Sequence, residues 1–153
     1  MLIGLISDTH GLLRPEVFEA LAGVELILHA GDVGSRSVLT ELRAIAPVRA
    51  VFGNTDSPGE PGLVRNIELD LEQLSVLVTH GHELGSPTPG GLLARYEADV
   101  IVFGHTHKPV IERAGTRLVV NPGAAGPRRF KLKASVARMT IVGADADVDI
   151  VWL

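Results

Sequence analysis

The sequence predicts an α/β fold, and three observations lead to that prediction. Over the first third of the chain, short apolar runs alternate with amphipathic segments, which is typical of a β-α-β-α-β unit with parallel strands. The later part of the chain is typical instead of antiparallel strands joined by turns. No repeat, linker or shift of composition marks a boundary. We therefore expect residues 1–153 to form a single domain, with a second sheet built from the later strands.

The elements of the first third follow from compact apolar runs and from helix boundary residues. The predicted strands are Leu2–Ile6, Val24–Leu28 and Val48–Phe52. Between the first two, Pro15 suits the start of a helix and Gly23 suits its end. A second helix begins at a serine cap, either Ser35 or Ser37, and ends before Pro47.

The rest of the chain predicts mostly strands. Residues 57–62 form a loop by their glycine and proline content, and a turn at 87–91 leads into a helix with Leu92, Leu93 and Tyr96 on one side. The predicted strands are Val64–Leu71, Leu74–Thr79, Asp99–Phe103, Val110–Arg113, Arg117–Val120, Ser135–Val142 and Val148–Trp152.

Composition excludes several classes of protein. Of the 153 residues, 46% are hydrophobic and 21% charged, and no apolar run reaches the ~20 residues that span a bilayer. The apolar start breaks at Ser7-Asp8, which favours a first strand over a signal peptide. The chain has no cysteine, which excludes thiolate metal sites and fits a cytoplasmic protein. A net charge of −4 does not favour a stable nucleic-acid complex.

Residues that can bind metal follow five of the predicted strands. Ligands of open α/β sheets bind beyond the carboxyl ends of the strands, so we expect these side chains to meet in one cleft. They are Asp8, His10, Asp32, Asn54, His80, His105 and His107. In Asp8-Thr9-His10 and His105-Thr106-His107 the outer residues stand two apart. In extended backbone each pair would therefore point to the same side.

The donor atoms restrict the metal. Asp and Asn offer oxygen, His offers nitrogen and no sulfur is available, which suits Mn²⁺, Fe, Co²⁺, Ni²⁺ or Zn²⁺ better than Ca²⁺ or Mg²⁺. Seven ligands are too many for one tetrahedral ion. We therefore expect two divalent ions, with Mn²⁺ as the first candidate, held roughly 3.5–4 Å apart by a shared carboxylate.

Five ordered blocks carry a family resemblance: Asp8-Thr9-His10, Gly31-Asp32, Gly53-Asn54, His80-Gly81 and Gly104-His105-Thr106-His107. They resemble the motifs of the calcineurin-like metallophosphoesterases, and most of all the small single-domain phosphodiesterases of bacteria and archaea. The resemblance implies two packed mixed β-sheets flanked by helices, an αββα sandwich. It also implies a metal-dependent phosphodiesterase in which a hydroxide between two metals attacks phosphorus.

The resemblance further implies roles for single residues. Asp8, His10 and His107 would bind the first metal, Asn54, His80 and His105 the second, and Asp32 would bridge both. Of these we assign Asp32, Asn54 and His80 to catalysis. The implied substrate is a small phosphate ester, with nucleotides among the candidates, and no membrane contact is expected. Members of the family often pair through exposed strands, which leaves a homodimer as an open alternative.

One position departs from the wider superfamily. Thr55 stands where many members carry a His that helps to protonate the leaving group. Asp56, His82 or a metal-bound water are the remaining sources of that proton. His82 otherwise either touches the substrate or a metal-binding residue, or is solvated. His29 lies in an apolar strand, which favours a hydrogen-bonded role in the structure or behind a ligand.

Other interpretations use the same residues. Ser7 lacks the G-x-S-x-G elbow of a serine hydrolase, and Gly90-Gly91 lacks the pattern of a phosphate loop. The alternative function is a non-catalytic, protein-binding scaffold of the same fold, like the retromer subunit, whose metal-ligand set is incomplete. The four histidines that follow strands here, His10, His80, His105 and His107, favour catalysis.

Two segments near the carboxyl end have weaker interpretations. The basic run 128–133 is either a rim that attracts phosphate or a solvated turn and strand edge with Phe130 and Leu132 facing inward, and we favour the second. Residues 121–124 predict a turn, which the resemblance places at the rim of the cleft. There Arg128 would meet a phosphate.

Overall fold

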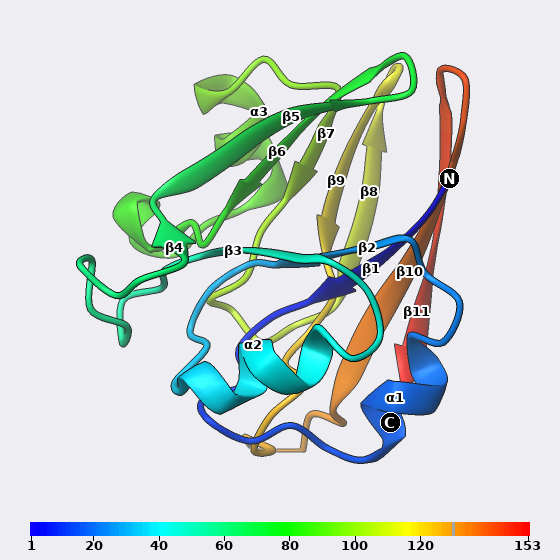
Figure 1. The fold of residues 1–153 in the computed structure, drawn as a ribbon. Helices are drawn as coiled ribbons and strands as arrows, with labels where there is room; N and C mark the ends of the chain where they lie inside the picture. Colours follow the sequence, from blue (N-terminus) through cyan, green and yellow to red (C-terminus); the bar gives the residue numbers. More distant parts are fainter. Residues whose placement is uncertain (130) are drawn as a thin grey trace.

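Two β-sheets pack face to face in the computed structural model, which describes residues 1–129 and 131–153 (Figure 1). Helices α1 (Glu16–Ala20) and α2 (Arg36–Leu42) cover the outer face of one sheet, and α3 (Pro89–Arg95) covers the outer face of the other. This αββα sandwich confirms the predicted α/β class. Within the described residues, no helix has the length and apolar character needed to cross a membrane.

The first sheet contains the predicted parallel unit. Its strands are β1 (Leu2–Ile6), β2 (Leu26–His29), β3 (Val48–Val51), β4 (Leu63–Val64), β10 (Ser135–Val142) and β11 (Asp145–Trp152). They lie in the order β11-β10-β1-β2-β3-β4. The strands from β1 to β4 are parallel, and α1 and α2 form the crossovers from β1 to β2 and from β2 to β3. Ser35, one of the two predicted caps, accepts a hydrogen bond from Ser37 N at the start of α2.

The second sheet has a parallel centre and antiparallel edges. Its strands are β5 (Asn66–Leu71), β6 (Leu74–Thr79), β7 (Val100–Val102), β8 (Val110–Ala114) and β9 (Arg117–Asn121), in the order β5-β6-β7-β9-β8. The neighbours β6, β7 and β9 are parallel, while β5 and β8 pair antiparallel at the two edges. The connection from β6 to β7 carries the short turn η1 (His82–Leu84) and α3.

Two details of the predicted layout were wrong. The expected strand Val64–Leu71 is two strands, because the chain leaves the first sheet after β4 and enters the second at β5. The later strands also do not all build the second sheet. The pair β10 and β11 returns to the first sheet, where β10 occupies the free edge of β1 and places Met139 against the core between the sheets.

Residues of the central strands alternate between two buried layers. In β6, Val76 and Val78 pack in the core between the sheets, whereas Leu77 packs in the cluster beneath α3. In β7, Val102 packs in the core between the sheets and Ile101 packs beneath α3. Because both faces are buried, such strands have continuous apolar sequences, which is why they were easy to locate.

The described residues of the basic segment, 128–129 and 131–133, form a loop rather than a strand edge. Arg128, Arg129, Lys131 and Lys133 are exposed and Leu132 is half-buried, while the next strand begins only at Ser135. The expected inward position of Phe130 lies outside the described residues.

Candidate metal centre

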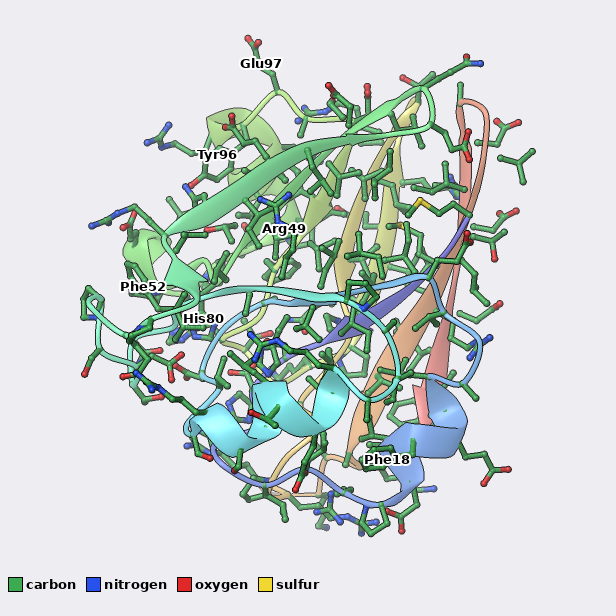
Figure 2. The ribbon with its side chains drawn as sticks, in the orientation of Figure 1. Phe18, Arg49, Phe52, His80, Tyr96 and Glu97 are labelled. Carbon is green, nitrogen blue, oxygen red and sulfur yellow. The ribbon has the colours of Figure 1, made fainter. Side chains whose placement is uncertain are left out.

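The loops that follow the parallel strands of both sheets meet at one end of the sandwich. The loops after β3 and β6 approach each other there, because Asn54 Oδ1 lies 3.1 Å from His80 Nε2. Figure 2 labels Phe52 and His80, which directly follow these two strands. The loop after β1 is joined to the loop after β2, because His10 N donates a hydrogen bond of 2.9 Å to Asp32 O. Thr9 Oγ1 adds a second link of 2.8 Å to Val33 O. Hydrogen bonds therefore hold these loops together at this end of the sandwich.

Most of the candidate ligands have left-handed backbone. The φ angles are 53° at Asp8, 45° at His10, 53° at Asp32, 72° at His105 and 64° at His107. Residues other than glycine rarely adopt such angles, and strained backbone of this kind clusters at functional sites. The extended backbone expected at Asp8-Thr9-His10 and His105-Thr106-His107 is therefore wrong. Asp8 and His10 still face one group of ligands, whereas His105 and His107 turn toward two different groups.

The first group consists of Asp8, His10 and His107. Asp8 Oδ1 lies 3.3 Å from His107 Nε2 and 3.9 Å from His10 Nε2, and the two ring nitrogens are 3.4 Å apart. Asp8 is fully buried, and its Oδ2 accepts hydrogen bonds from Ser7 Oγ and His105 N. Its Oδ1 has no hydrogen-bond partner among the described residues. A buried, unpartnered carboxylate oxygen facing imidazole nitrogens suits a cation.

The second group gathers around Asn54. Asn54 Oδ1 lies 3.1 Å from His80 Nε2 and 3.1 Å from His105 Nδ1. The opposite ring nitrogen of His80, Nδ1, donates to Ala30 O at 2.7 Å. That bond fixes the ring so that Nε2 faces the group, as it does in histidines that bind metals.

Asp32 lies between the two groups. Its Oδ2 is 3.7 Å from His10 Nε2 and 3.3 Å from His80 Nε2, while its Oδ1 accepts the backbone N–H of Thr55 at 2.9 Å. The structure thus brings all seven predicted residues together. Asp8, His10 and His107 form one possible metal-binding set, and Asp8, Asp32 and His80 form another. Asn54 and His105 adjoin the second set.

Burial and charge act in opposite directions on the ionisation of these groups. Burial lowers the pKa of His10 and of His105 and outweighs the nearby carboxylates, which act to raise it. Burial opposes ionisation of Asp32, but hydrogen bonds from His80 and Thr55 outweigh it and hold the pKa of Asp32 below its usual range. For His80, burial is outweighed by the Asp32 and Asp8 carboxylates, so its pKa is raised. The carboxylates thus favour positive charge between them, whether from a proton or a metal ion.

His29 has the structural role expected of it. Its Nδ1 accepts from Gly31 N at 3.1 Å, and its Nε2 lies 3.0 Å from Thr9 Oγ1. Because Thr9 Oγ1 donates to Val33 O, it accepts the proton of His29 Nε2. Complete burial lowers the pKa of His29 to about 4, so the ring is neutral.

His82 lies next to the second group, which decides between its two interpretations. Its ring centroid is 5.3 Å from that of His80 and 6.4 Å from that of His105. The side chain is half-buried, and its Nδ1 has no hydrogen-bond partner in the described part of the chain. It is therefore a neighbour of the candidate ligands and not a freely solvated residue.

Two further residues hold the loops, and the sequence did not predict these roles. Asp56, considered as a proton source, accepts three backbone N–H groups with its carboxylate. Asn121, expected in a turn, instead ends β9, is fully buried, and donates to Gly104 O and Thr106 Oγ1 in the loop of His105 and His107. A polar residue at the apolar end of a predicted strand was the available indication for Asn121.

The fold and the donor atoms define a class: an α/β protein with candidate sites for divalent ions at the carboxyl ends of its strands. The chain belongs to the calcineurin-like phosphoesterase superfamily, whose domain model matches residues 1–144. A probable metallophosphoesterase of Methanothermobacter thermautotrophicus is 39% identical, over 99% of this chain and 92% of that protein. A phosphodiesterase of Methanocaldococcus jannaschii is 32% identical, over 80% of this chain and 83% of the relative.

A solved structure of Vps29 shares the fold. A Vps29 variant from Entamoeba histolytica superposes with a TM-score of 0.80 at 23% identity, covering 100% of this chain and 99% of the other. At that identity the likeness concerns the fold alone. Membership of the superfamily implies divalent metal ions and phosphoesterase chemistry.

Proposed function

We propose that this protein is a phosphodiesterase that binds two divalent metal ions, with Mn²⁺ as the first candidate. The observation that carries the proposal is the buried Oδ1 of Asp8. It has no hydrogen-bond partner in the described residues and faces the ring nitrogens of His107 and His10. Such an atom is costly to bury unless a hydrogen-bond donor or a cation satisfies it, and the imidazole nitrogens around this one suit a metal cation.

The ligand assignment follows the two groups of side chains. Asp8, His10 and His107 would hold one ion, and Asn54, His80 and His105 the other. Asp32 would contact both, which its position between His10 Nε2 at 3.7 Å and His80 Nε2 at 3.3 Å supports. Asp and His donors without sulfur match first-row transition ions such as Mn²⁺. When bound, such ions lower the pKa of water to supply a nucleophile and neutralise charge on phosphoryl oxygens.

The protein's own residues would orient the ester and the ligands. The bond from His80 Nδ1 to Ala30 O keeps Nε2 directed at Asp32 and Asn54. This geometry supports a direct catalytic role for Asp32, Asn54 and His80. Ala125 N and Gly126 N donate to Ser7 O and Asp8 O, which holds the loop before Arg128 against the site. Arg128 is exposed on that loop and would meet a phosphate oxygen of the substrate.

Hydrolysis distinguishes this proposal from a non-catalytic scaffold of the same fold. The seven candidate ligands lie in two adjoining groups, each with short distances between its donor atoms, and this complete set supports catalysis over a scaffold role. The substrate would be a small phosphodiester, with nucleotides among the candidates.

The test combines metal analysis with hydrolysis. Purified protein is expected to contain about two divalent ions per chain after incubation with Mn²⁺. It should hydrolyse bis(p-nitrophenyl) phosphate, lose that activity on chelation and regain it with Mn²⁺. Full activity in chelated, metal-free protein would contradict the mechanism. Protein that is inactive with every first-row divalent ion would favour the scaffold.

A further inference from the structure

The carboxylate of Asp56 connects the two loops that carry Asp32 and Asn54. Its Oδ2 accepts hydrogen bonds from Val33 N at 3.0 Å and Gly53 N at 2.9 Å, and its Oδ1 accepts from Gly34 N at 3.0 Å. Val33 and Gly34 follow Asp32 in the sequence, and Gly53 precedes Asn54. One side chain therefore binds the backbone immediately beside two of the candidate ligands.

The two loops are also in direct contact. A Cβ atom on Gly53 would lie only 2.1 Å from Asp32 Oδ1 and 2.5 Å from Asp32 N, so the backbones touch at this point. Thr55 N donates to Asp32 Oδ1 at 2.9 Å, which ties the second loop to the first. Asp32 itself has a φ of 53°, a conformation that needs support from its surroundings.

We propose that Asp56 is a positioning residue, whose carboxylate fixes Asp32 and Asn54 at a separation and orientation ready to bind metal. Three N–H groups converge on it, so its removal would leave the backbone after Asp32 without acceptors. The Asp32 carboxylate would then lose its orientation toward His80 and His10. Both oxygens of Asp56 are occupied by these bonds, so it acts through the ligands and is not the proton donor for the leaving group. The inference rests on the proposed function only in taking Asp32 and Asn54 as metal ligands.

Asp99 offers a matched control. It is also a half-buried aspartate beside a strand, and its Oδ2 accepts hydrogen bonds from Ser75 N at 2.8 Å and Ser75 Oγ at 2.9 Å. It precedes β7, whereas the metal centre lies beyond the other end of that strand. Removal of the Asp99 carboxylate should therefore lower the stability of the fold to a similar extent and leave the positions of the candidate ligands unchanged.

The experiment is a calorimetric titration of Mn²⁺ into native protein and into the variants Asp56→Ala, Asp56→Asn and Asp99→Ala, below their unfolding temperatures. Asp56→Ala should lower the affinity for Mn²⁺ by about 10- to 100-fold, the usual scale for residues that orient metal ligands. Asp56→Asn should lose less, because its one carbonyl oxygen can keep the bonds from Val33 and Gly53. Its amide group would face Gly34 N, a donor. Asp99→Ala should melt earlier and bind Mn²⁺ as tightly as native protein.

The outcomes separate this inference from the proposed function. If Asp56→Ala binds Mn²⁺ like native protein, or if Asp99→Ala loses as much affinity, Asp56 has a general structural role and the inference is wrong. If Asp56→Ala does not fold, Asp56→Asn decides by the same comparison. Native protein that binds Mn²⁺ but hydrolyses no ester would contradict the proposed function. The Mn²⁺ affinities of native protein and the Asp56 variants would still test the positioning role of Asp56. Native protein that binds no Mn²⁺ would overturn both.

Discussion

His80 Nε2 lies 3.3 Å from Asp32 Oδ2, while the opposite nitrogen of the same ring donates to Ala30 O. The backbone just after β2 thus fixes one side of the His80 ring. The other side faces the carboxylate of Asp32, which lies in the loop after the same strand. This relationship brings a residue of the second sheet against a residue of the first. The candidate metal centre therefore depends on how the two sheets are packed.

Asp32→Asn is expected to abolish most of the activity, because the Asp32 carboxylate lies between His10 of the first group and His80 of the second. We expect a loss in kcat/KM of about 100-fold or more, the scale of removing one electrostatic stabiliser of a transition state. His29 is buried at the end of β2 and belongs to neither group of ligands, so His29→Ala should act mainly on stability. Steady-state kinetics of both variants at saturating Mn²⁺ make the comparison, and equal, mild effects would mean that the site is misplaced.

His29 should make the stability of the protein depend on pH. Its pKa is lowered from 6.5 in the unfolded chain to about 4 in the fold, so the unfolded state binds more protons between these values. The stabilisation is fully present above pH 6.5 and is lost as the pH falls toward about 4. Over that interval the loss amounts to about 3 kcal/mol.

Urea unfolding of chelated protein at several pH values measures this effect. The variant His29→Gln removes the titration, so its free energy of unfolding should vary less between pH 4 and 6.5 than that of native protein. The other histidines titrate in both proteins and cancel in the difference. Parallel curves for the two proteins would show that His29 does not carry the dependence.

Gly53→Ala should damage the metal centre by steric conflict. The new Cβ would lie 2.1 Å from Asp32 Oδ1 and 2.5 Å from backbone atom Asp32 N, so one of the two loops must shift. We expect a destabilisation of about 1–3 kcal/mol together with weaker Mn²⁺ binding.

Gly59→Ala is the matched control in the same connection, since a Cβ there has no neighbour within 4 Å in the described structure. It should change stability by less than about 0.5 kcal/mol. Thermal unfolding and Mn²⁺ titration check both variants, and two equal results would contradict the close contact between the loops.

Thr55→His should change which esters react well. A hydroxyl is a poor proton donor compared with an imidazolium, whose unperturbed pKa is ~6.5. Native enzyme should therefore prefer esters with acidic leaving groups such as nitrophenolate. Because Thr55 is exposed and contacts Asp32 through its backbone N–H, the larger side chain can be accommodated without loss of that bond. The variant should help alkyl esters more than aryl esters, by less than the ~10²–10⁴-fold of a well-placed general acid.

The measurement is the slope of log rate against leaving-group pKa, for native enzyme and variant with the same metal. A steep native slope that becomes shallower in the variant is the expected result. A shallow native slope that the mutation leaves unchanged would show that another group already donates the proton. His82, which lies beside His80 and His105, would then be the first residue to substitute.

The sequence by itself determined the parallel unit and the residues of the candidate site. Buried parallel strands need continuous apolar runs, and polar residues that end such runs are conspicuous, so Asp8, Asn54 and His80 could be selected without a structure. Sequence order also implies proximity here, because parallel strands joined by crossovers present the same end to one edge.

Only the tertiary structure decided which strands pair and what supports the ligands. An alternating apolar pattern indicates that one face of a strand is buried, but not which other strand or sheet packs against it. The change of sheets after Val64 and the return of β10 to β1 were therefore not predictable. The left-handed backbone at Asp8 and Asp32 and the three N–H groups gathered by Asp56 depend on contacts between loops distant in sequence. Local pattern carries no information on such contacts, because their energy is realised only when the loops meet.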